Sequence, residues 1–278
     1  MRRFWLHFSR NPLSLLGMII IVILVLTGIF GPYLAPYDPV AISPAERLQS
    51  PDREHLLGTD ELGRDVLSRI IAGSRISLEI GLSIVFLSAS IGMLIGLASG
   101  YFGGPVDHIL MRITDIFISL PTLILAIAIT AALGPSLPNA VLAMVLVWWP
   151  IYARLIRGEV LSVKGKDYIR AMKVMGASPL RIIVFHVLPN TIDSVIVRAS
   201  IDFGNAVMFC AALSFIGLGA QPPTPEWGAM VTAGQNYMRD AWWIITFSGL
   251  AIFLTVMGFN LLGDGIRDFL DPRIKGKS

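Results

Sequence analysis

The residue types that most often carry catalysis or bind metals are few in this chain and are not grouped. Cys210 is the only cysteine, so neither an intrachain disulfide nor a cysteine-based metal site can form. The four histidines lie far apart and lack the spacing of metal ligands. The chain ends in GKS, but Asp271 stands where a phosphate-binding loop requires its first glycine. The sequence therefore predicts no enzyme active site, no metal site and no cofactor or ATP bound by this chain.

Charged residues within an apolar run are the next candidates for a functional role. Asp193, Arg198 and Asp202 lie in one such run, where charges are costly and often mark a pathway or a pair. Arg198 and Asp202 are four residues apart, so a helix places them on one face, roughly continued by Asn205 and Met208. We expect a pair that either lines a pore or forms a structural salt bridge, unless Arg198 extends to water. Asp193 is expected to reach the interface.

A third candidate is the charged segment 166–190, KDYIRAMKVMGASPLRIIVFHVLPN. Tyr168, Met172 and Met175 are spaced as an apolar stripe on an amphipathic helix. Gly176 can end this helix in the left-handed conformation. The pattern predicts a short helix that presents one apolar face.

A second short helix is expected directly after that glycine. Ser178 suits the N-cap position and Pro179 the first helical position, while Pro189 is expected to stop or kink the helix. Basic residues outnumber acidic ones between 154 and 190, so the segment could lie on anionic lipid. A helix–glycine–helix with an apolar stripe, however, favours insertion into a protein groove.

The surrounding chain is that of an integral membrane protein. Of its 278 residues, 54% are hydrophobic and 15% are charged, against about 25% charged in soluble domains. The apolar residues form long runs, which indicate transmembrane helices. The sequence predicts an all-α membrane protein with six spans, at 13–30, 80–97, 116–133, 137–153, 191–216 and 242–262.

The distribution of Lys and Arg predicts the orientation. Most of these 22 residues fall in segments that share one side if both termini lie in the cytoplasm. The segment 154–190 is then cytoplasmic. We expect residues 1–75 to form a first span with an outer segment, and 76–278 to form the core.

The outer segment 31–75 is expected to have two halves. Its first half is rich in proline and should be irregular. Its second half has apolar residues at helical spacing and Thr59 or Asp60 as a cap, which predicts an interfacial helix that leads into the second span.

At this point a resemblance is evident. DYIRAMKVMGASPLRIIVFHVLPN resembles the cytoplasmic "EAA" signature of binding-protein-dependent ABC importer permeases. Asp167 stands where glutamate is usual, Ala171 fills the first alanine position, and Met172 replaces the second alanine. Gly176 matches, as does the Leu-Pro ending at 188–189.

Other segments resemble the C-type permeases of dipeptide, oligopeptide and nickel uptake systems. These are LGTDELGRDVLSRIIAGSRISL, YFGGPVDHILMRITDIFISLP, LSFIGLGAQPPTPEWGAMV and FNLLGDGIRDFLDPR, which together extend the similarity over nearly the whole chain beyond Pro12. The resemblance implies a type I ABC importer permease fold in a bacterial or archaeal cytoplasmic membrane. It also implies a second, homologous permease, two ATPase subunits that bind ATP and Mg²⁺, an extracytoplasmic solute-binding protein and no nucleic acid partner.

The resemblance assigns the segment 154–190 to ATPase coupling. The residues it singles out are Asp167, Tyr168, Ala171, Met172, Met175, Gly176, Leu188 and Pro189. It leaves the solute open between dipeptides, oligopeptides, nickel complexes, glutathione and opines. A secondary transporter driven by an ion gradient is the main rival, but it usually has inverted repeats and helices broken at the midplane, and the sequence indicates neither.

Overall fold

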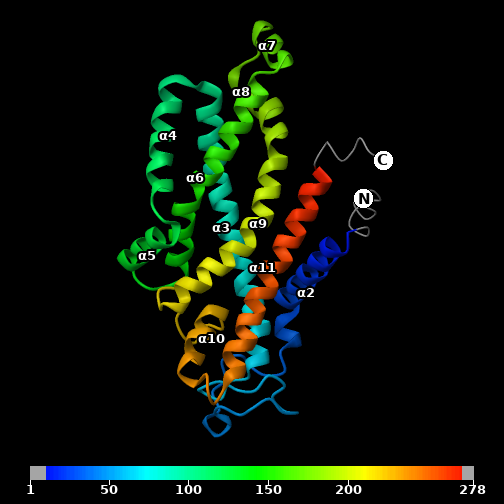
Figure 1. The fold of residues 1–278 in the computed structure, drawn as a ribbon, viewed down its shortest axis with the longest axis vertical. Helices are drawn as coiled ribbons and strands as arrows, with labels where there is room; N and C mark the ends of the chain where they lie inside the picture. Colours follow the sequence, from blue (N-terminus) through cyan, green and yellow to red (C-terminus); the bar gives the residue numbers. More distant parts are fainter. Residues whose placement is uncertain (1–10, 271–278) are drawn as a thin grey trace.

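The computed structural model of the protein describes residues 11–270, and the regular secondary structure within that range is helical apart from one isolated bridge between Thr59 and Asp65. The bundle is elongated, with α7 and α8 at one end and the segment 35–65 and α10 at the other (Figure 1). The helices in chain order are α2 (Pro12–Leu34), α3 (Val66–Phe102), α4 (Gly104–Ser119), α5 (Thr122–Leu133), α6 (Leu137–Lys164), α7 (Asp167–Val174), α8 (Pro179–Ile182), α9 (Leu188–Phe215), α10 (Trp227–Gly234) and α11 (Trp242–Leu270). The predictions for the two termini and for GKS at 276–278 fall outside the described residues.

Five described helices are long and apolar enough to cross a membrane. They are α2, α3, α6, the continuous helix Pro179–Phe215 and α11. The pair α4 and α5 passes the same test only as a bent unit, so the count is five, or six if this pair crosses as one span.

The prediction of a straight span over 116–133 is wrong. The chain bends by 92° between α4 and α5, at Leu120 and Pro121. Leu120 is extended, with φ −95° and ψ 140°, because the ring of the following proline disfavours a helical conformation at the preceding residue. The apolar run therefore continues through a corner that composition alone does not reveal.

The predicted helix that leads into the second span is present from Val66, but its predicted start at Thr59 or Asp60 and its interfacial position are wrong. Gly63 has φ +76°, and the helix begins only at Val66. Asp65, rather than Thr59 or Asp60, is the N-cap and accepts a hydrogen bond from the Ser68 amide at 2.7 Å. From there α3 runs without a break to Phe102, and its first turns are buried rather than laid on a membrane surface.

The core of the bundle is the contact between α3 and α6, where small residues allow a close approach. An added Cβ at Gly92 would lie 2.5 Å from the Trp149 carbonyl oxygen, and one at Gly96 would lie 2.6 Å from the Ala153 carbonyl oxygen. Helix α6 thereby lies directly against the backbone of α3. The remaining spans pack around this pair, with α11 against α9 and α2.

Of the two outcomes predicted for Pro189, a stop or a kink of the helix that begins at Pro179, the structure excludes the stop. The helix continues from Pro179 to Phe215 through a π-helical turn, η2 (Ile183–Val187). The Leu188 amide donates to the Ile183 carbonyl, five residues back, rather than to the usual partner four back. This wider turn lets the chain enter α9 although proline offers no amide hydrogen.

The first half of the segment predicted to be outer is mostly irregular, as expected, and the segment is held together by buried polar contacts. Arg64 donates from Nε to Asp60 at 2.6 Å. Arg69 donates to the carbonyl oxygen of Pro39 at 2.8 Å. His55 lies 3.0 Å from Asp65. These contacts tie the segment 35–65 to the start of α3.

Candidate functional site

The segment between α6 and α9 forms a compact helical hairpin at one end of the bundle (Figure 1). Helix α7 ends at Val174, and Gly176 has φ +83°, the left-handed conformation predicted for it. The Ala177 amide then donates to the Met172 carbonyl at 3.0 Å, which closes the turn in the manner of a Schellman motif. Ser178 caps α8 through the Arg181 amide at 3.4 Å, as predicted.

The inner side of this hairpin is packed onto the bundle by three fully buried side chains. Ile169, Ile182 and Val187 join the apolar cluster that also contains Ile156 and Val160 of α6. Burying an aliphatic side chain of this size contributes about 1.5–3 kcal/mol. The hairpin is therefore attached to α6 and continues directly into α9.

The outer side of the hairpin exposes a set of large apolar side chains, which we name the docking face. Val174 is 89% exposed, Leu180 is 71% exposed and Phe185 is 68% exposed. Tyr168 and Met175 are exposed beside them. Exposed apolar patches of this kind mark interaction sites.

The predicted apolar stripe of Tyr168, Met172 and Met175, which was expected to enter a protein groove, does not form one exposed face. Met172 is partly buried against the bundle, whereas Tyr168 and Met175 point to the outside. The reason is the shortness of α7, because Met175 lies beyond its last residue at the C-cap. Ile169, which the pattern did not select, provides the buried anchor.

The other residues assigned to coupling lie on the same hairpin. Asp167 opens α7 and is exposed, with Arg170 at 3.7 Å. Ala171 and Pro189 are exposed, and Leu188 is partly buried against the apolar cluster.

The predicted pair on α9 is present. Arg198 donates from Nε to Asp202 at 2.8 Å, as the four-residue spacing indicated. Its side chain is 41% exposed, whereas that of Asp202 is 3% exposed. Asn205 is partly buried and Met208 is exposed. A buried carboxylate thus faces inward, with its cation at the edge of the bundle.

Tyr152 of α6 is a residue that sequence reasoning missed. It is fully buried and lies beside Asp202, although its hydroxyl makes no hydrogen bond of normal geometry within residues 11–270. A tyrosine in an apolar run was the available signal, because a buried phenol usually finds a polar partner.

Two ion pairs between α4 and α6 were also missed. Arg157 donates to both oxygens of Asp107, at 2.5 and 2.7 Å, and Asp107 also accepts from the Ser99 hydroxyl. Arg154 donates to Asp115 at 2.6 Å. These arginines were assigned to a cytoplasmic segment that starts at 154, but they belong to α6. Their partners are about forty to fifty residues away in sequence, so spacing could not reveal them.

Comparison with protein families identifies the chain. Residues 92–276 match the model of the binding-protein-dependent transport system inner membrane component. The chain belongs to this permease family. Residues 1–51 match a second model, the N-terminal transmembrane domain of oligopeptide transport permease C, so the likeness extends before Pro12.

Individual relatives span almost the whole permease. This chain is 50% identical to the probable D,D-dipeptide transport system permease protein DdpC of Escherichia coli (strain K12), over 96% of this chain and 90% of the relative. This chain is 46% identical to the dipeptide transport system permease protein DppC of the same strain, over 99% of this chain and 94% of the relative. This chain is 42% identical to the glutathione transport system permease protein GsiD of Escherichia coli O6:K15:H31 (strain 536 / UPEC), over 98% of this chain and 90% of the relative.

A solved structure supports the same fold. The permease matches a chain of the inward-facing MetNI methionine ABC transporter with a TM-score of 0.53 at 20% identity, over 70% of this chain and 95% of the other. The chain is thus a permease subunit of an ABC importer with the type I permease fold.

Proposed function

We propose that this permease forms half of a pore for the uptake of dipeptides, driven by ATP. The observation that carries the proposal is the docking face, an exposed apolar surface on a hairpin that is packed onto α6 and continues into α9. Such a surface suits insertion into the groove of a cytoplasmic ATPase subunit.

The mechanism follows from how the hairpin is attached. Ile169 and Ile182 fix it to α6, and η2 continues it into α9. When ATP binding draws two ATPase subunits together, a displacement of the hairpin is transmitted to both helices as a rigid-body rotation. ATP binding then biases the equilibrium between inward- and outward-facing states. ATP and Mg²⁺ are bound by the ATPase subunits, so the permease alone neither binds nor hydrolyses ATP.

The proposed assembly contains one homologous second permease, two ATPase subunits and an extracytoplasmic solute-binding protein. The excess of Lys and Arg supports an orientation with both termini and the α7–α8 hairpin in the cytoplasm. The bent pair α4–α5 then crosses as the sixth span. In this orientation the segment 35–65 and α10 face the binding protein from the outer side of the cytoplasmic membrane.

We assign Arg198, Asp202, Asn205 and Met208 to the pore side of α9. A half-exposed guanidinium over a buried carboxylate supports this, because charges at membrane depth are retained at pathways or pairs. In the assembled pore the remaining donors of Arg198 can contact the carboxylate of a passing peptide.

Dipeptides are the proposed solute class because several relatives with 43–50% identity are dipeptide permeases. Glutathione is the second candidate, since the GsiD permease is 42% identical over 98% of this chain. Both solutes are small peptides with a free ammonium group and a carboxylate, so one polar pore serves either.

The test is uptake of a radiolabelled dipeptide by proteoliposomes that contain the permease, its partner permease, two ATPase subunits and the binding protein. We expect uptake that requires both ATP and the binding protein, with labelled glutathione as a parallel substrate. Uptake driven by an ion gradient in the absence of ATP would refute the proposal. Saturable ATP binding to the purified permease alone would refute the assignment of ATP to the partners.

A further inference from the structure

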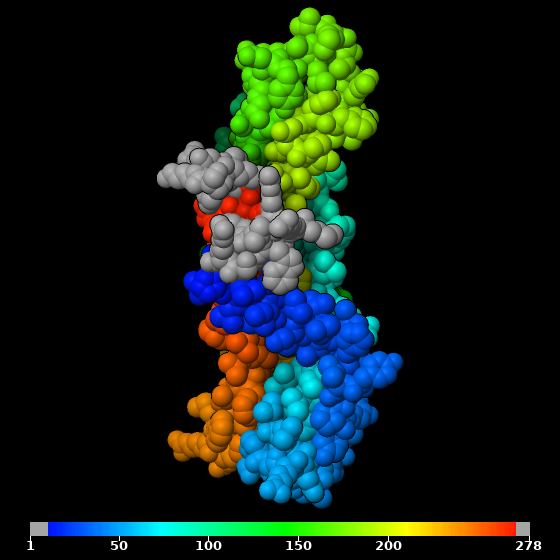
Figure 2. All heavy atoms as spheres, turned by 90° about the vertical axis from the view of Figure 1, so that its right-hand side faces the viewer, coloured from blue at the N-terminus to red at the C-terminus, as the bar shows by residue number. Residues whose placement is uncertain are grey.

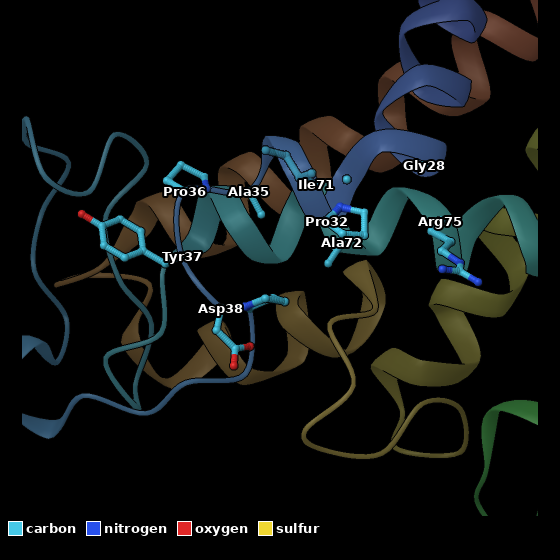
Figure 3. Close-up of a pocket in the computed structure, with 11 residues that line it drawn as sticks. Gly28, Pro32, Ala35, Pro36, Tyr37, Asp38, Ile71, Ala72 and Arg75 are labelled. Carbon is cyan, nitrogen blue, oxygen red and sulfur yellow. The ribbon is translucent and has the colours of Figure 1, made fainter.

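A hollow lies between the end of α2, the segment that follows it and the start of α3 (Figure 3). Its volume is about 470 Å³. The residues that line it are Gly28, Gly31, Pro32, Ala35, Pro36, Tyr37, Asp38, Pro39, Ile71, Ala72 and Arg75. The hollow lies at the opposite end of the bundle from the docking face, so the coupling site does not use it.

The hollow spans the edge of the lipid-facing part of the bundle. On α2, Ile29 and Phe30 are exposed and apolar, and the exposed Tyr33 follows them, as is typical of a helix leaving the hydrocarbon layer. On α3, Arg75 and Glu79 are exposed and form an ion pair at 3.0 Å.

Gly28 of α2 packs beside Arg75, and Gly31 packs beside Ile71. Arg75 therefore lies level with Gly28, and Glu79 lies one turn closer to the centre of the bundle. Because exposed charges avoid hydrocarbon, the membrane boundary lies close to Gly28, and the lipid-facing apolar positions of α2 are those before it, such as Ile23 and Leu26.

The floor of the hollow is apolar and built from small residues. Gly28 packs so closely on α3 that an added Cβ would lie 2.5 Å from a methyl carbon of Leu78. Pro32 and Ala72 lie in the middle of the view in Figure 3, between the labelled residues at the two ends of the hollow. The floor therefore continues the lipid-facing surface of α2 and offers no hydrogen-bonding side chain of its own.

Opposite charges stand on the two sides of this floor. Figure 3 shows Asp38 on one side and Arg75 on the other, with Pro32 and Ala72 between them. Asp38 accepts from the Val40 amide at 3.0 Å through Oδ1, and its Oδ2 accepts no hydrogen bond within residues 11–270. Arg75 donates to Glu79 through Nε, which leaves its two terminal amino groups without a partner in the same range.

We propose that the hollow binds a zwitterionic aminophospholipid, phosphatidylethanolamine, from the leaflet beside the segment 35–65. The ammonium group donates to Asp38, the phosphate accepts from the terminal amino groups of Arg75, and the glycerol backbone covers Pro32 and Ala72. The acyl chains then follow the exposed apolar side of α2. This site lies outside the proposed import pathway and does not depend on the solute.

The charges favour this lipid over the alternatives. Asp38 and Arg75 both line the hollow, and Glu79, which does not line it, is paired with Arg75. The charges near the hollow therefore have no positive excess, and an anionic headgroup such as phosphatidylglycerol meets net repulsion. A dipeptide also carries both charges, but it has no apolar tail to place along exposed residues of α2 such as Ile23 and Leu26. The continuity of the apolar floor with a lipid-facing helix therefore favours a lipid.

The test is native mass spectrometry of the assembled transporter in detergent, with phosphatidylethanolamine and phosphatidylglycerol added in equal amounts. We expect the wild type to retain phosphatidylethanolamine in preference, by about two- to fivefold if each headgroup contact resembles an exposed ion pair. Asp38→Asn keeps the Oδ1 acceptor for Val40 but removes the charge, and should abolish the preference. Arg75→Gln should do the same.

A filling variant and a charge control complete the experiment. Ala72→Leu leaves both charges in place and blocks the floor, so it should also lower retention while complex yield stays normal. Arg53 is an exposed residue of the same segment but does not line the hollow. Arg53→Gln should therefore leave the retention of phosphatidylethanolamine unchanged. Equal retention of the two lipids by the wild type, undiminished retention in Asp38→Asn, or displacement of the lipid by a dipeptide would each overturn the proposal.

Discussion

Arg198 on α9 donates a hydrogen bond to Asp202 one turn later, and the two groups differ sharply in their surroundings. The guanidinium is half-exposed, whereas the carboxylate is buried beside Tyr152 of α6. The ion pair therefore compensates a buried negative charge that the neighbouring apolar residues cannot. This arrangement makes the two residues unequal in their expected response to substitution.

Arg198→Ala should impair complex yield or transport more than Asp202→Asn. The arginine variant leaves a buried carboxylate with no cation, which costs about 3–5 kcal/mol in a buried pair. The asparagine variant leaves only a half-exposed arginine that water can reach. Yield and dipeptide uptake of both variants check the order.

The double variant separates a structural pair from a solute contact. If the pair is only structural, Arg198→Ala combined with Asp202→Asn should recover part of the lost yield and of the transport. If Arg198 contacts the solute, the double variant should assemble well and transport nothing. Near-normal uptake by both single variants would remove these residues from the pore.

Phe185→Asp should uncouple ATP hydrolysis from transport. The Phe185 side chain lies on the docking face and is not part of the buried cluster. An aspartate at this position places a charge where the ATPase groove is expected to be apolar. The binding protein should then stimulate ATPase activity several-fold less than in the wild type. Val22→Asn, at an exposed apolar position of α2, is the control that alters surface polarity away from the hairpin. Equal stimulation of Phe185→Asp and the wild type would contradict the docking face.

Gly176→Ala should weaken coupling, whereas Gly165→Ala should not. Gly176 has φ +83°, where a side chain costs about 1 kcal/mol or more, while Gly165 has φ −73°, which any residue adopts. Both glycines flank α7, so the pair isolates backbone strain from added bulk. ATPase stimulation and uptake by the two variants are the measurements, and matching behaviour would show that the turn has no role.

Arg157→Gln should loosen α4 from α6. Asp107 would lose the hydrogen bonds that it accepts from the guanidinium and would retain only the one from the Ser99 hydroxyl. Hydrogen exchange of α4 should increase relative to the wild type, with little change at α11. Arg112→Gln removes an exposed arginine of α4 itself and serves as the comparison, because exposed charges contribute little to stability. Unchanged exchange in α4 would mean that the pair does not hold it.

Stability should depend on the ionisation of Glu226. This residue caps α10 through the Gly228 and Ala229 amides at 2.9 Å each, and burial raises the pKa of its carboxyl above the usual range. The folded protein therefore holds the proton more tightly than the unfolded chain. The contribution to stability is present below the unfolded pKa, about 4.3, and is lost as pH rises through the folded pKa.

Glu226→Gln should flatten this dependence. As pH increases from about 4.3, the apparent melting temperature of the wild type should fall relative to that of the variant. Asp240→Asn, at an exposed position outside α10, controls for general charge effects. A constant difference across the pH range would contradict the raised pKa.

Much of the fold follows from local properties of the sequence. Long apolar runs indicated the spans because transfer into lipid depends on each segment by itself. The turn at Gly176 and the cap at Ser178 were predictable because each depends on a few consecutive residues. The pair Arg198–Asp202 was predictable for the same reason, since one helical turn brings the two together.

Tertiary structure decided the features that depend on distant partners. Ile169, rather than Tyr168, anchors α7, because the neighbouring α6 determines which side of a short helix is buried. Arg157 meets Asp107 only once α4 folds back on α6. The 92° bend at Leu120 and Pro121 interrupts an apolar run without changing its composition. Sequence periodicity describes one helix at a time, and it contains no information about which other helix will lie against it.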